Sequence, residues 1–98
     1  MQLEIQSIHF TANELLLATI HEKFDKLEHK DSKIESCHIV LKKEKNDHGL
    51  NFMAEGRLKL PGNDLFASER AESPELAISK VTDDLERQLL KHQQKARR

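Results

Sequence analysis

The last quarter of the chain reads as one long helix with a single apolar side, and this feature limits the possible folds most. Ser73, Pro74 and Glu75 carry the signals of a helix start: an N-cap hydroxyl, a proline at the first helical position and an acid in the first turn. At 100° per residue, the apolar residues that follow fall within about 80° of one another. They are Ile78, Val81, Leu85 and Leu89. Such a helix buries its apolar side against another element, so the chain requires a layered domain.

The first third of the chain supplies a strand and a second amphipathic helix. Residues 2–8 alternate between apolar and polar side chains, which is typical of a half-buried strand. Thr11 and Glu14 then have the spacing of a capping box, while Asn13 is an alternative N-cap that starts the helix two residues later. One stripe at helical spacing predicts the buried side of this helix: Leu16, Ile20, Phe24 and Leu27.

The middle of the chain alternates strand-forming segments with turn signals. Residues 34–45 are rich in β-formers and predict a second strand. The turn residues 46–49 lead to a third strand that starts near Leu50, and residues 61–64 form the next turn. Residues 65–70 complete the set as a short fourth strand. The element order is therefore β-α-β-β-β-α.

This order predicts an α+β two-layer domain, a four-stranded sheet with two helices packed on one face. Short turns join strands two to four, so these strands are expected to form an antiparallel meander. The first strand reaches the second through a helix, which favours a parallel pair. Each helix has one apolar stripe, so both helices are expected on the same side of the sheet.

Bulk composition limits the class of protein. The 98 residues suffice for one domain, which we expect to span residues 1–98. No apolar run is long enough for a membrane span, and the N-terminus lacks the pattern of a secretory signal. Cys37 is the only cysteine, so an intrachain disulfide is excluded. The sequence therefore predicts a soluble cytoplasmic protein without a membrane partner.

Positive charge is concentrated at the end of an otherwise acidic chain. The formal net charge is −1, yet five basic residues and no acidic residue lie between Arg87 and Arg98. On the helical wheel, four basic residues fall within about 40° and nearly opposite the apolar stripe, with a fifth beside them. We name these five residues the basic column: Lys80, Arg87, Lys91, Lys95 and Arg98. Asp84 interrupts it, at a spacing that suits an ion pair with Arg87 or Lys80.

The predicted first helix carries a smaller basic set along one edge of its apolar stripe. We name it the lysine edge: Lys23, Lys26 and Lys30. If the two helices lie side by side, the lysine edge and the basic column can form one positive face that suits phosphate groups. Basic residues in the last turns of a helix also complement its macrodipole, so the pattern alone leaves both interpretations open.

No arrangement of residues predicts catalysis or a metal site. Adjacent Cys37 and His38 point to opposite faces of a strand, so they cannot act as a nucleophile and its base. His21 and His29 lie eight residues apart, not at the i,i+4 spacing of a helical metal pair. We therefore expect no enzymatic activity, catalytic residue, metal site, cofactor or small-molecule substrate.

Four segments, in this order and spacing, resemble a known family. The sequence reads HEKFDKLE at residues 21–28, VLKKEK at 40–45, LFAS at 65–68 and LERQLLKHQQK at 85–95. These segments are similar to those of the ribosome hibernation promoting factor family, the ribosome-associated inhibitors related to small-subunit protein S30EA. The resemblance covers nearly the whole chain.

The resemblance implies both a fold and a function. Members of the family have a β-α-β-β-β-α fold related to double-stranded RNA-binding domains. They bind the small ribosomal subunit in the channel of messenger and transfer RNA, occlude the decoding and peptidyl sites, and hold ribosomes idle under stress. Basic side chains from both helices contact ribosomal RNA phosphates, which implies this role for Lys23, Lys26, Arg87, Lys91 and Lys95. The helical wheel, rather than the resemblance, adds Lys80 and Arg98, and the lysine edge of the first helix adds Lys30.

The sequence also departs from the family pattern. The family often has lysine at the position of Asp84, basic residues at those of Gln93 and Leu17, and an aromatic residue around Glu75. The chain ends shortly after its last helix, so we expect no C-terminal dimerisation domain and a monomer away from the ribosome. Two alternatives stay open: a general structured-RNA-binding domain that acts off the ribosome, and a protein-interaction module with an acidic working surface.

Overall fold

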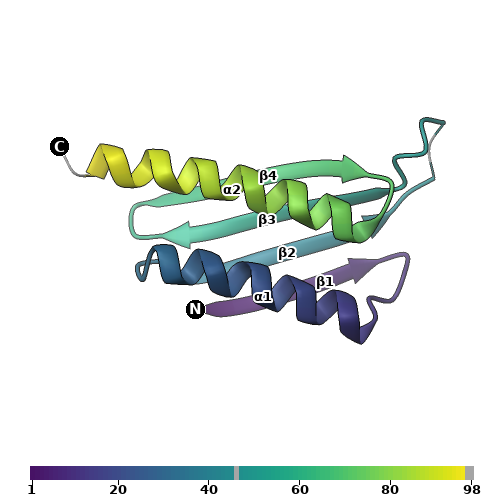
Figure 1. Cartoon of the computed structure of the whole chain (residues 1–98), viewed down its shortest axis with the longest axis horizontal. Coiled ribbons are helices and arrows are strands. Elements are labelled where there is room, and N and C mark those ends of the chain that lie inside the picture. Colours follow the sequence, from purple (N-terminus) through teal and green to yellow (C-terminus); the bar gives the residue numbers. More distant parts are fainter. Residues whose placement is uncertain (46, 97–98) are drawn as a thin grey trace.

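The computed structural model describes residues 1–45 and 47–96, which form one sheet covered on one face by two helices (Figure 1). The elements occur in the predicted order, β-α-β-β-β-α. They are β1 (Gln2–Ile8), α1 (Glu14–Lys30), β2 (Ser36–Lys43), β3 (Phe52–Leu60), β4 (Asn63–Ala71) and α2 (Pro74–Ala96). The predicted α+β two-layer class is therefore confirmed.

The sheet has the strand order β1-β2-β3-β4, so β1 and β4 are its edges. β1 pairs with β2 in parallel, as predicted, because α1 carries the chain back to the end of the sheet at which β1 began. β2 pairs with β3, and β3 with β4, in antiparallel orientation. The predicted meander is confirmed as well.

The boundaries of three strands differ from those predicted. β2 covers Ser36–Lys43, two residues shorter at each end than the predicted segment 34–45. β4 begins at Asn63 rather than at Leu65, since Pro61 and Gly62 alone turn the chain and Leu60 pairs directly with Asn63. Gly62 has a φ of 76°, the left-handed conformation that glycine adopts without a Cβ penalty. A two-residue turn lets pairing start at once, and composition did not reveal this. β3 begins at Phe52, two residues after the predicted start near Leu50.

Side-chain caps set the start of both helices. The side chain of Asn13 accepts a hydrogen bond from the backbone N–H of Leu16 at 2.8 Å, so Asn13 rather than Thr11 is the N-cap of α1. The hydroxyl of Ser73 accepts one from the N–H of Leu76 at 3.1 Å, which confirms the predicted start of α2. Satisfying these free N–H groups fixes where each helix begins, and hence where its side chains point.

The core lies between the sheet and the two helices. Every member of the two predicted apolar stripes is buried. On β2, the buried residues Cys37, Ile39 and Leu41 alternate with residues on the opposite face, as the period of two in a strand requires. α2 lies over β3 and β4, and α1 lies beside it over β1 and β2 (Figure 1). No helix among residues 1–45 and 47–96 covers the other sheet face.

Neither helix is suited to crossing a lipid bilayer. Across the two described stretches, 1–45 and 47–96, no helix combines the length and the apolar character that a membrane span requires.

Candidate nucleic-acid interface

The two helices form a continuous layer whose outer side faces solvent. They lie side by side and run in the same direction, so their C-terminal ends meet at one end of the molecule (Figure 1). The amide of Gln93 on α2 donates a hydrogen bond to the backbone carbonyl of Lys30 on α1 at 2.8 Å. It also contacts Asp31 Oδ2 at 3.4 Å. These bonds satisfy oxygen atoms at the end of α1 and tie the two helices together.

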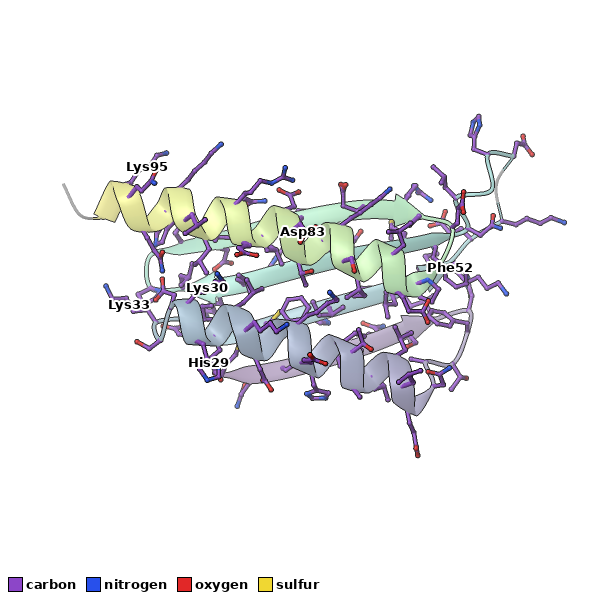
Figure 2. All side chains as sticks on the ribbon, in the orientation of Figure 1. His29, Lys30, Lys33, Phe52, Asp83 and Lys95 are labelled. Carbon is purple, nitrogen blue, oxygen red and sulfur yellow. The ribbon has the colours of Figure 1, made fainter. Side chains whose placement is uncertain are left out.

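The core fixes the orientation of the basic column. The apolar stripe of α2 is completely buried, so the helix cannot rotate about its axis without exposing it. The opposite side of α2 therefore faces solvent, and Arg87, Lys91 and Lys95 are exposed there. The Arg87 side chain is 73% exposed. Figure 2 shows Lys95 near the C-terminal end of α2. Lys80 belongs to the same column, whereas Arg98 lies outside the described residues.

Contacts with β4 show on which side of α2 the basic column lies. Lys80 Nζ donates a hydrogen bond to the carbonyl of Arg70 at 3.2 Å, and Gln88 Nε2 donates one to the carbonyl of Phe66 at 2.8 Å. Both carbonyls belong to the edge strand β4. The flank of α2 that carries Lys80 and Gln88 therefore overlies β4. The column is displaced toward this edge of the sheet, away from α1.

The lysine edge lines a groove between the two helices. The groove has a volume of about 310 Å³ and is lined by Lys23, Lys26, Leu27, Lys30, Thr82, Asp83 and Glu86. Its α1 wall thus supplies three ammonium groups, while its α2 wall supplies two carboxylates. Lys30 Nζ and the Glu86 carboxylate form an ion pair across it at 2.9 Å.

The two carboxylates of the groove separate the basic sets. We name Asp83 and Glu86 the acidic ridge; Figure 2 marks Asp83 midway along α2 and Lys30 near the end of α1. On the wheel, both acids fall between the basic column and the side of α2 that faces α1. The helices do lie side by side, as the sequence hypothesis required. The prediction that the two basic sets form one positive face is wrong, because Asp83 and Glu86 lie between them. The structure has two basic tracks with an acidic ridge between them.

Sequence reasoning missed the acidic ridge because one helix does not show which of its flanks faces the other. Asp83 and Glu86 are three residues apart, so they share one flank of α2. Only the strand order, with α1 over β1 and β2, places α1 beside that flank. The i,i+3 spacing was the available signal, and it becomes informative once the topology is known.

Two of the four departures from the family pattern, Asp84 and Gln93, have local structural roles. Asp84 lies 3.9 Å from Arg87 and accepts a hydrogen bond from Gln88 at 3.2 Å, so the expected pair with Arg87 is confirmed. The alternative pair with Lys80 is not formed, because that ammonium contacts β4 instead. Gln93 ties the helices as described, and an amide suits this task because it donates to carbonyl groups without adding charge.

Other reactive side chains do not form a site. Burial raises the pKa of the Cys37 thiol to about 12, so it is a protonated core residue rather than a nucleophile. Within the described stretches 1–45 and 47–96, no group of three His, Cys, Asp or Glu residues could hold a metal ion. The helical layer is therefore the best candidate for a functional surface.

Fold and surface together define a small α+β domain that presents a charged helical layer. A ribosomal subunit interface protein from Coxiella burnetii has this fold, with a TM-score of 0.85 and 19% identity over 95% of this chain and 98% of that chain. The N-terminal domain of Protein Y from Thermus thermophilus has a TM-score of 0.75 and 19% identity, and covers 90% of this chain and 94% of that chain.

Sequence comparison gives the family. The family model described as Sigma 54 modulation protein / S30EA ribosomal protein matches residues 3–97, and the chain belongs to this family. A ribosome hibernation promoting factor from Acinetobacter guillouiae is 33% identical over 94% of this chain and 87% of its own length. Its counterpart from Escherichia coli K12 is 34% identical over 97% of this chain and 96% of its own length. The predicted family is confirmed.

Proposed function

We propose that this protein is a ribosome hibernation factor that binds the small ribosomal subunit in the channel of messenger and transfer RNA. It acts in the cytoplasm, inhibits translation and holds ribosomes idle. Membership of the S30EA family and relatives named ribosome hibernation promoting factor support the ribosome as its partner.

The observation that carries the proposal is the exposed basic column on a helix whose opposite side is locked in the core. Arg87, Lys91 and Lys95 project from one rigid element. The protein therefore does not have to order a loop or a tail before it binds phosphates, and preorganisation of this kind lowers the cost of binding. Lys23 and Lys26 supply a second track on α1.

The mode of binding is that of a non-enzymatic plug. The domain measures 46 × 26 × 18 Å along its principal axes. It recognises folded RNA through shape and phosphate contacts, because its charged helical layer offers ammonium and guanidinium groups rather than a base-stacking surface. The domain is a monomer away from the ribosome, and its occupancy of the channel excludes the RNA ligands of translation.

Co-sedimentation with purified small subunits tests this assignment. The double variant Arg87→Ala/Lys91→Ala removes two exposed cations without touching the core, so it should fold normally and bind more weakly. Because this variant neutralises two fewer phosphates, its slope of log affinity against log salt should become shallower by roughly 1.4 to 1.8. A matched control, Arg57→Ala/Lys59→Ala, removes the same charge from exposed positions on the uncovered sheet face. Equally weakened binding in both double variants would contradict the assignment.

A competition experiment separates ribosome binding from general RNA binding. Labelled small subunits carrying the protein are challenged with unlabelled subunits or with an unrelated RNA duplex at equal nucleotide concentration. The proposal requires the subunits to compete far better than the duplex. Equal competition would instead identify a general structured-RNA-binding domain.

A further inference from the structure

The acidic ridge is costly for a protein that binds RNA, and folding stability does not explain it. Glu86 pairs with Lys30 at 2.9 Å, but the two side chains are 38% and 44% exposed, and ion pairs this accessible contribute little to folding. Asp83 is exposed and makes no ion pair with any residue of 1–45 or 47–96. The charge of these two carboxylates can therefore act on binding without a large effect on folding.

The ridge controls access to the groove. Without it, the three ammonium groups of the lysine edge would face a cavity of about 310 Å³, which is large enough for a phosphate group. With the acidic ridge in place, a phosphate in the groove would approach two carboxylates. The Lys30 ammonium is also less available to a phosphate, because it already forms an ion pair with Glu86. Like charges repel, and solvent screens this repulsion in part because the charged side chains that line the groove are accessible.

We propose that Asp83 and Glu86 are specificity-determining residues that keep RNA backbone out of the interhelical groove. Resting on the proposed function, this inference divides RNA contact between two tracks. One is the part of the lysine edge that does not pair with the ridge, Lys23 and Lys26, and the other is the described basic column. Lys26 lies 3.9 Å from Glu22 on its own helix, but both side chains are more than 70% exposed, so this pair leaves the ammonium accessible. A folded RNA whose backbone passes on both sides of the ridge binds with unchanged affinity. An RNA whose backbone would have to enter the groove binds more weakly.

Isosteric neutralisation tests the proposal. In Asp83→Asn/Glu86→Gln the ridge keeps its shape but loses its charge, and Lys30 becomes free. If the groove then admits one phosphate, the salt slope for an unrelated RNA duplex should steepen by roughly 0.7 to 0.9, with an affinity gain of about fivefold at 0.1 M salt. Affinity for small subunits should change by less, since their contacts already avoid the ridge. Discrimination between subunit and duplex should therefore fall.

The control removes the same two charges elsewhere. Glu4→Gln/Asp64→Asn neutralises exposed acids on the outer strands β1 and β4, away from the groove. It shifts the net charge by the same amount, so it should raise duplex affinity less and leave the slope unchanged. Asp83→Asn alone is a second variant, because it breaks no ion pair. Circular dichroism checks that each variant is folded.

The outcomes separate this proposal from the proposed function. If the ridge variant and its control affect duplex binding equally, net charge is the only cause and the ridge has no role. If wild-type protein fails to bind small subunits, the proposed function fails, yet the duplex comparison still measures whether the ridge excludes RNA backbone. A ridge variant that gains equally on subunit and duplex overturns the inference about discrimination.

Discussion

Gly56 in β3 gives the sharpest test of how α2 is held on the sheet. An added Cβ at Gly56 would lie 2.9 Å from both Leu85 Cδ1 and Val81 Cγ1, and 3.3 Å from Ile39 Cδ1. All three neighbours are completely buried. Val81 is β-branched and stiff, so it cannot simply rotate away from the new methyl group. Gly56→Ala therefore forces α2 away from β3 or forces a side chain off its rotamer.

The magnitude follows from two opposing effects. Overpacking of a well-packed core costs about 1 to 3 kcal/mol. Alanine also restricts the unfolded chain, which offsets this by about 0.4 to 1 kcal/mol. The free energy of unfolding should thus fall by about 1 to 2 kcal/mol, which corresponds to a Tm lower by about 4 to 16 °C for a domain of this size.

Urea and thermal unfolding of four proteins measure this effect and its cause. The set is the wild type, Gly56→Ala, Val81→Ala and the double variant. Val81→Ala removes one clashing atom, so the double variant should be destabilised by less than the sum of the two single effects, by at least about 0.5 kcal/mol. If Gly56→Ala is as stable as the wild type, or if the two effects simply add, then α2 does not pack on β3 at this spacing.

Three further predictions concern single positions. Lys30→Ala should weaken small-subunit binding by about twofold or less at 0.1 M salt, because the Lys30 ammonium already pairs with Glu86 of the acidic ridge. Lys23→Ala should weaken it by about fivefold. Equal weakening by the two variants in a filter-binding assay would contradict this prediction. Asn13→Ala should lower the free energy of unfolding by about 1 kcal/mol while Thr11→Ala changes it little, since only Asn13 caps α1; urea unfolding distinguishes the two. Burial raises the pKa of the Cys37 thiol from 9.0 to about 12, so iodoacetamide should label this thiol at pH 8.5 only after the protein unfolds. The free energy of unfolding should also fall as the pH rises above about 9, because there the thiol ionises in the unfolded chain but not in the folded protein. Rapid labelling of the folded protein would show that the thiol is accessible.

The framework of the fold was predictable because its signals are local. Ser73 and Pro74 mark the start of α2, and the apolar stripes of both helices are buried as predicted. The order of elements favoured a parallel β1–β2 pair, which the structure has. At the start of α1, the sequence offered two caps, and the hydrogen bond from Leu16 to Asn13 chooses between them.

Features that depend on contacts between distant segments were not predictable. Gln93 caps the end of α1 from 63 residues away. The ion pair of Lys30 with Glu86 joins the two helices across the groove. Neither partner in these pairs carries a local signal for the other. For the same reason, the basic residues could be identified but not the acidic ridge that divides them.

The salt dependence of binding to purified small subunits tests the central claim most directly. If Lys23, Lys26, Arg87, Lys91 and Lys95 each neutralise one phosphate, the slope of log affinity against log salt should be about −3.5 to −4.5. Such a slope would support a plug held by two basic tracks on a rigid helical layer. A slope near zero, or no binding at low salt, would contradict the claim that this surface binds ribosomal RNA.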